Sequence, residues 1–199
     1  DNVDCLEGLK HNGQTMVCWS LSGHTQSRLI EKDTATDEAR IEAMRKCRAW
    51  GYHVRCRFSP VIPVKGWREE NRALVERLFS KVQPDVISLQ SLSRFPEYDM
   101  VPRLLDLDLL DPSFVGAAQR AKSEMEGRIV GPFPHEKRLE IYRFLLDEIK
   151  RISPQTPVSL CLESPEMWQD LGPIMGISPN AYPCCCGGLC TPGQPIMAG

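Results

Sequence analysis

Hydrophobic residues along the chain fall into two patterns that alternate with one another. Short apolar runs predict buried strands, and they occur at residues 15–20, 53–58, 85–89 and 158–162. Longer segments with apolar residues three or four positions apart predict helices, and they occur at residues 34–50, 67–80, 136–151 and 165–172. The stretch from about 93 to 135 is rich in Pro and Gly and has only a weak helical pattern at 113–125.

Capping and breaking residues predict where several elements begin and end. Thr34 lies three residues before Asp37, which is the spacing of a capping box, and this predicts that a helix opens at Thr34. Pro60 is expected to end the second strand, because proline cannot donate to a sheet ladder. Ser164 is expected to cap a short helix that ends at Gly172.

The order of these elements indicates the fold class. Strands and helices that alternate, with mostly apolar strands, favour parallel βαβ units over a sandwich, and so an α/β protein. Four such strands fit either an open doubly wound sheet or part of a barrel, and the pattern leaves both open. A chain of 199 residues is long enough for one sizeable core.

Composition narrows the function classes. The 24 Lys and Arg residues are balanced by 26 Asp and Glu, so no global basic field indicates nucleic-acid binding. No apolar run is long enough to span a bilayer, and the first residues lack the pattern of a secretory signal, so we expect no membrane partner and a cytoplasmic location. Four cysteines that lie in apolar runs are expected to act as small hydrophobes in a reduced chain: Cys18, Cys47, Cys56 and Cys161.

Candidate ligand-binding residues follow the predicted strands. In α/β proteins ligands bind at the carboxyl ends of the strands, and here every such end is polar: Ser20, Ser22 and His24, then Ser59, then Gln90 and Ser91, and finally Glu163. Solvation of loops alone would explain part of this pattern. No glycine-rich phosphate loop follows any strand. Four arginines, Arg45, Arg48, Arg55 and Arg57, are interpreted as solvated surface rather than a phosphate site.

The C-terminal tail is a candidate metal site. Cys184, Cys186 and Cys190 offer closely spaced thiolates, which suit zinc or an iron–sulfur cluster. A thiol-rich irregular tail without metal is the equal alternative.

Several motifs resemble the spore photoproduct lyase family, within the radical S-adenosylmethionine (SAM) superfamily. They are Cys18-Trp-Ser-Leu-Ser22, Glu31-Lys-Asp-Thr34, Arg40-Ile-Glu-Ala43, Gly51-Tyr-His-Val54, Pro60-Val-Ile-Pro63 and Ser93-Arg94-Phe95. The resemblance covers residues 1 to about 95 well and 136–163 moderately.

The resemblance implies the C-terminal part of a partial (β/α) TIM-like barrel over residues 1–172, followed by an irregular Cys-rich tail at 173–199. It implies a lyase-like enzyme that binds SAM on a [4Fe–4S] cluster and uses the 5′-deoxyadenosyl radical to abstract hydrogen. Ser20 matches a serine that contacts SAM, and Ser59 matches a position whose backbone lies against the adenine. No residue is assigned a catalytic role.

The sequence also departs from the family pattern. The cluster's Cys-x-x-x-Cys-x-x-Cys motif is expected upstream, so the N-terminal half of the same enzyme is an expected partner, and the chain alone is expected to be inactive. Where the family has a basic and aromatic hairpin, residues 127–133 carry no tyrosine. The substrate is left open, with DNA and a DNA repair lyase among the alternatives. The second hypothesis is a non-catalytic α/β module with a structural metal in the tail.

Overall fold

The computed structural model describes residues 2–95, 97–178 and 185. Its strands are β1 (Met16–Leu21), β2 (His53–Val61), β3 (Ile87–Ser91) and β4 (Val158–Leu160). Its longer helices are α1 (Asp37–Ala49), α2 (Trp67–Lys81), α6 (His135–Ile152) and α7 (Pro165–Met175). Three short helices fill the middle stretch: α3 (Val101–Leu104), α4 (Pro112–Arg120) and α5 (Lys122–Met125). Each predicted strand and long helix is therefore present.

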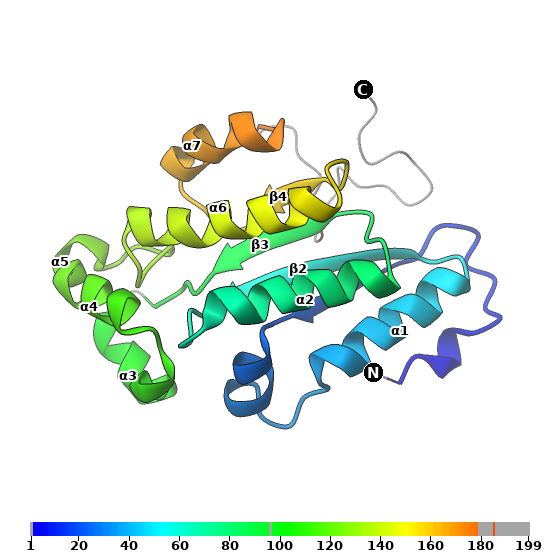
Figure 1. Ribbon diagram of the computed structural model, residues 1–199, viewed down its shortest axis with the longest axis horizontal. Coiled ribbons are helices and arrows are strands. Elements are labelled where there is room, and N and C mark those ends of the chain that lie inside the picture. Colours follow the sequence, from blue (N-terminus) through cyan, green and yellow to red (C-terminus); the bar gives the residue numbers. More distant parts are fainter. Residues whose placement is uncertain (1, 96, 179–184, 186–199) are drawn as a thin grey trace.

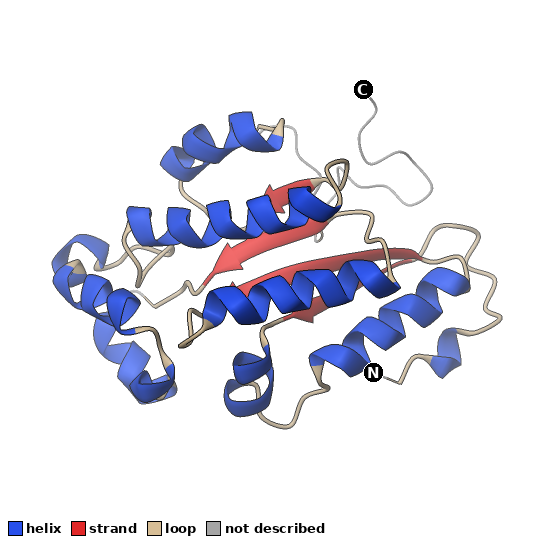
Figure 2. Ribbon diagram, viewed as in Figure 1, coloured by secondary structure: helices blue, strands red, loops and turns tan. Residues whose placement is uncertain are grey.

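The four strands form one parallel sheet in the order β1-β2-β3-β4. A doubly wound sheet reverses its strand order at a switch point, whereas this order is sequential. Because parallel crossovers are right-handed, successive crossovers in one direction place their helices on one face. Figure 2 shows α1, α2 and α6 together on the same side of the strands. The predicted α/β class is confirmed, and the topology is consistent with part of a (β/α) barrel.

The two faces of the sheet differ sharply in chemistry. On β2 the side chains of Val54, Cys56 and Phe58 are at most 1% exposed and belong to the core beneath the helices. Arg55, Arg57 and Ser59 alternate with them and so project to the opposite face. We call this opposite side of the sheet the polar face.

The polar face extends across all four strands. Cys18 and Ser20 of β1 pair in register with Arg55 and Arg57 of β2. Ser88 of β3 pairs with Arg57 on one side and with Ser159 of β4 on the other. The hydroxyls of Ser88 and Ser159 lie 2.9 Å apart and are hydrogen-bonded. Polar side chains thus fill the face that a closed barrel would turn inward.

Three of the ends that capping and breaking residues predicted differ from the structure. Thr36, not Thr34, caps α1, because its Oγ1 accepts a hydrogen bond from the Ala39 amide at 3.2 Å. β2 continues through Pro60 to Val61, and the register between β2 and β3 shifts there, as at a β-bulge. α7 passes Gly172 and ends at Gly176, whose φ of 69° suits a left-handed C-cap.

The middle stretch packs at one end of the molecule. Figure 1 shows α3, α4 and α5 beyond the carboxyl ends of the strands, at the left. Phe114 of α4 meets Trp67 and Phe133 edge-on, with ring centroids 5.8 and 5.3 Å apart. Residues 127–133 contain no strand. Phe133 is 1% exposed, so this segment anchors the insert to the core.

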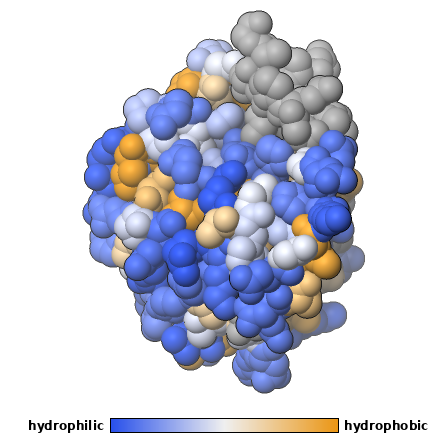
Figure 3. All heavy atoms as spheres, turned by 90° about the vertical axis from the view of Figure 1, so that its right-hand side faces the viewer, coloured by the Kyte–Doolittle hydropathy of each residue, from blue (hydrophilic) through white to orange (hydrophobic). Residues whose placement is uncertain are grey.

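The opposite end of the molecule, where the strands begin, is mostly hydrophilic. In Figure 3 apolar residues appear there only as small patches among polar ones on the coloured surface.

Because the core lies on the helix-covered face, truncation of a buried side chain there should lower stability more than truncation of an exposed one. Leu89→Ala on β3, where the side chain is fully buried, is expected to lower the free energy of unfolding by about 2–5 kcal/mol, because it leaves a cavity. Leu104→Ala, at a side chain that is 66% exposed, should change it by less than about 0.5 kcal/mol. Urea denaturation of both variants measures this. Equal losses would contradict the assigned core.

Candidate functional site

A row of polar side chains lies at the carboxyl ends of β1, β2 and β3. Arg57 donates from Nη2 to the Ser20 hydroxyl at 3.5 Å. The Ser59 hydroxyl donates to Gln90 Oε1 at 2.6 Å, and Gln90 Nε2 donates to Ser93 Oγ at 2.7 Å. We call these five residues the strand-end row. Ser20 and Ser59, predicted from different parts of the sequence, therefore lie on one edge and one face of the sheet.

Arg40 of α1 fixes the end of β1. Its Nη1 donates to the Ser20 carbonyl at 2.9 Å, while its Nη2 donates to Glu31 Oε2 at 2.9 Å and to Thr34 Oγ1 at 2.8 Å. The side chains of Arg40 and Glu31 are only 11% and 22% exposed, so water screens this ion pair less than a surface pair. The position of Ser20 is thus set by a guanidinium from the following helix.

Gln26 connects the ends of β1 and β2. This side chain lies in the loop after β1 and is buried. Its Nε2 donates to the Pro60 carbonyl at 2.8 Å, and its Oε1 accepts from the Ile62 amide at 3.0 Å. One amide side chain therefore holds the main chain just beyond Ser59 against the loop that follows Ser20.

A buried ionic network holds the ends of β3 and β4 to α6. Arg138 Nε donates to Glu163 Oε1 at 3.1 Å, and both side chains are at most 3% exposed. The Tyr142 hydroxyl donates to the same Glu163 oxygen at 2.6 Å and accepts from the Ser91 amide at 2.8 Å. Burial and the negative charge of Glu163 raise the pKa of Tyr142 well above its ordinary value.

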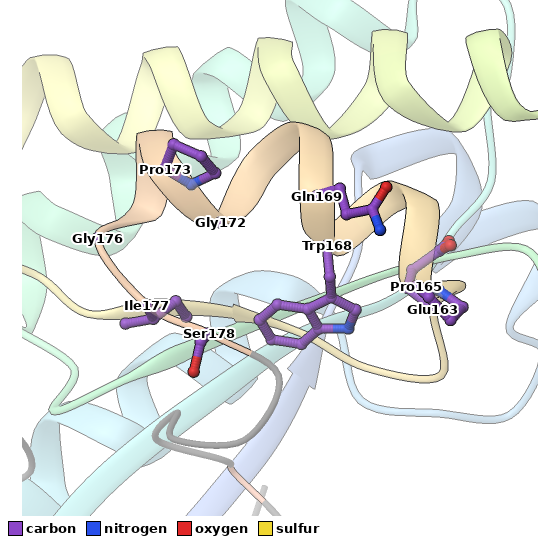
Figure 4. A pocket seen from close by; sticks show the side chains of 9 residues that line it. All are labelled: Glu163, Pro165, Trp168, Gln169, Gly172, Pro173, Gly176, Ile177 and Ser178. Atoms are coloured by element: carbon purple, nitrogen blue, oxygen red, sulfur yellow. The ribbon is translucent and has the colours of Figure 1, made fainter.

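A cavity of about 890 Å³ opens beside Glu163. Figure 4 shows the indole of Trp168 lying between α7 and the segment that carries Gly176, Ile177 and Ser178. The lining is mostly apolar, and its volume is within the range of small-molecule sites. This cavity lies at the end of β4, on the same edge of the sheet as the strand-end row.

The other residues predicted for the site differ in where the structure places them. Ser22 is 5% exposed, and its hydroxyl has no hydrogen-bond partner within the described part of the chain. His24 is exposed in a short helical turn between β1 and α1. Cys184, Cys186 and Cys190 lie outside the described residues, so the metal site there stays a prediction.

Two interpretations of residue types are wrong. Arg55 was expected on the solvated surface but is 2% exposed on the polar face. Cys18 was expected to act as a buried hydrophobe but is exposed, whereas Cys47 and Cys56 are buried as expected. The alternation of arginine with apolar residues along β2 carried the signal that Arg55 and Arg57 share a face with Ser59.

Comparisons with known proteins match the N-terminal part of the chain. The family model for spore photoproduct lyase matches residues 1–92, which include β1, β2, β3 and both predicted serines. The spore photoproduct lyase of Bacillus subtilis (strain 168) is 33% identical over 85 residues, which are 43% of this chain and 25% of that protein. No solved structure matches the chain. The resemblance to this family, and with it a relationship to radical SAM lyases, is confirmed for the N-terminal 92 residues.

The matched region is about a quarter of the length of that relative. The activity, substrates and partners of the whole lyase are therefore proposals for this chain. Within the described residues, no helix is both long and apolar enough to cross a membrane.

The Arg138–Glu163 pair predicts a large effect of charge removal. Glu163→Gln should lower the free energy of unfolding by about 3–5 kcal/mol, because it leaves the Arg138 charge buried without its counter-ion. Glu76→Gln removes the carboxylate of a half-exposed pair with Arg151 and should lower it by about 1 kcal/mol or less. Chemical denaturation of both variants measures the difference. Comparable losses would show that the buried pair does not hold the strand ends.

The raised pKa of Tyr142 predicts loss of stability at alkaline pH. Its contribution is fully present below the ordinary tyrosine pKa of about 10. It is lost as pH rises further, because the unfolded tyrosine ionises while the folded one stays neutral. The difference in unfolding free energy between wild type and Tyr142→Phe should narrow between about pH 9 and 11. A difference that stays constant with pH would contradict this.

Proposed function

We propose that this chain forms the SAM-binding and substrate-binding side of a radical SAM enzyme related to the spore photoproduct lyases. The observation that carries the proposal is that Ser20 and Ser59, the two positions matched to SAM contacts, lie on one face at neighbouring strand ends. Ligands of α/β barrels bind at this edge of the sheet.

The residues present suit a zwitterionic nucleoside ligand. The hydroxyl of Ser20 lies beside the positive charge of Arg57, and a guanidinium can bind a carboxylate. Ser22 offers a buried hydroxyl that has no hydrogen-bond partner among the described residues, and such a group is satisfied when a ligand supplies the missing bond. The main chain around Ser59, held by Gln26, would lie against the adenine.

The cysteine motif that holds the SAM-binding iron–sulfur cluster in the family is absent from this chain. The 199 residues contain no Cys-x-x-x-Cys-x-x-Cys motif, so the cluster ligands would come from other residues of the same enzyme. In our proposal its N-terminal half is the partner that completes the barrel against the polar face. When bound, SAM supplies the radical chemistry that removes hydrogen from the substrate.

The chain's own residues would bind SAM, orient it and form part of the substrate site. Arg40 and Gln26 hold the strand ends in place, which preorganises the site before the ligand arrives. The substrate would enter from the cavity beside Glu163 and Trp168, whose walls are mostly apolar. DNA is the first substrate class to test, and the cytoplasm is the proposed location.

The experiment uses the protein encoded by the complete reading frame, purified and reconstituted with iron and sulfide without oxygen. We expect 5′-deoxyadenosine to form from SAM when a reductant is added. Ser20→Ala should raise the KM for SAM by about ten-fold, which corresponds to one lost hydrogen bond to a charged ligand. Ser80→Ala, a matched change on an exposed helix surface, should leave KM unchanged.

Two outcomes would contradict the proposal. One is a reconstituted protein that forms no 5′-deoxyadenosine, and the other is a Ser20→Ala variant with unchanged KM. Tightly bound zinc in this chain alone, without SAM cleavage, would favour the non-catalytic module.

A further inference from the structure

Three potential metal ligands meet near the carboxyl end of β1, outside the strand-end row. His24 lies in a short helical turn within the loop that joins β1 to α1, and Asp37 and Glu38 are the first two residues of α1. One ligand atom from each residue lies within 4.8 Å of the others. The cluster therefore joins a loop to a helix that begins 13 residues later in the chain.

Glu70 of α2 fixes the backbone on both sides of His24. Its carboxylate accepts from the Thr25 amide at 2.9 Å and from the Thr25 hydroxyl at 2.6 Å. Gly23 packs so closely that an added Cβ would lie 2.9 Å from Glu70 Oε2. The loop thus holds His24 beside the start of α1 through contacts that do not involve His24 itself.

Asp37 presents a buried oxygen that lacks a partner. The residue is 1% exposed, and its Oδ2 is ion-paired with Arg77. Its Oδ1 has no hydrogen-bond partner within the described part of the chain. Burial of a carboxylate oxygen without a hydrogen-bond donor costs free energy. A proton or a cation bound to Asp37 Oδ1 would remove this cost.

Asp37 and Glu38 bring two carboxylates together at the start of α1, with one ligand oxygen of each within 4.8 Å of the other. Arg77 also donates to Glu38 at 3.1 Å, while Arg28 is 4.0 Å from Glu38 and half exposed. The guanidinium of Arg77 therefore forms ion pairs with both Asp37 and Glu38.

A simple surface ion pair explains only part of this arrangement. It accounts for the Asp37 Oδ2 and Glu38 Oε1 contacts with Arg77. It explains neither the unsatisfied Asp37 Oδ1 nor the placement of His24 beside the two acids. A cation bound between them would explain both.

We propose that His24, Asp37 and Glu38 bind one divalent metal ion of the kind that accepts nitrogen and oxygen ligands, such as Mn²⁺ or Zn²⁺. One imidazole and two carboxylates are a ligand set that these ions accept. Three protein ligands at a partly exposed site leave room for water to complete the coordination. The ion fastens the loop after β1 to α1, close to the Arg40 contact that positions Ser20. The site stands apart from the proposed SAM chemistry.

Mn²⁺ binding to the full chain, followed by electron paramagnetic resonance, tests this site. The background carries Cys184→Ser, Cys186→Ser and Cys190→Ser, so that tail thiolates cannot compete, and Mn²⁺ itself disfavours sulfur ligands. We expect one Mn²⁺ per chain, displaced by Zn²⁺. His24→Ala and Glu38→Gln, both at exposed residues, should each weaken binding by about ten-fold or more.

The control is His135→Ala. His135 also lies beside a carboxylate, with its Nε2 2.7 Å from Asp170, but it is not part of this three-ligand cluster. The control should bind Mn²⁺ as the parent does. Absence of saturable binding, or unchanged affinity in His24→Ala, would overturn the proposal. Neither result depends on SAM, so the outcome is independent of the proposed function.

Discussion

The handedness of the crossover connections is the constraint on which the rest of this structure depends. Four strands in sequential parallel order, joined by right-handed crossovers, place α1, α2 and α6 on one face of the sheet. The other face then receives no helix from these crossovers. Its side chains are polar, from Ser20 and Arg57 to Ser88 and Ser159. In our proposal this side meets ligand or further chain instead of a helical layer.

The same constraint gathers the functional residues at one edge. Each parallel strand finishes at the same end of the sheet, so residues far apart in the sequence become neighbours there. Side chains from outside the strands then fix their positions. Gln26 and Arg40 secure β1 and β2, and the Arg138–Glu163–Tyr142 network secures β3 and β4. Because these groups are largely buried, a displaced strand end would leave polar atoms unsatisfied.

Much of the fold could be predicted from the sequence, because hydrophobic periodicity is a local signal. The strands, the long helices and the positions of Ser20 and Ser59 at strand ends followed from it. Thr34 had the spacing of a cap, yet it donates to the Glu31 carbonyl and accepts from Arg40. These hydrogen bonds replace the capping role of Thr34, and they depend on side chains that meet only in the folded loop.

The supporting network could not be predicted for the same reason. Arg138 and Glu163 are 25 residues apart, and Gln26 and Pro60 are 34 apart. No local sequence pattern identifies partners that are so far apart in the chain. The burial of Arg55 depends likewise on the three-dimensional packing around the polar face, although alternation along β2 showed which face it shares with Ser59.

The central claim is that the carboxyl edge of the polar face is the ligand-binding edge. Titration of the ¹⁵N-labelled chain with SAM, followed by amide chemical shifts, tests it most directly. We expect the amides of Ser20, Leu21, Ser22, Ser59 and Val61 to shift together along one binding curve. Shifts confined to the helix-covered face or to the edge where the strands begin, with these two segments unmoved, would contradict it.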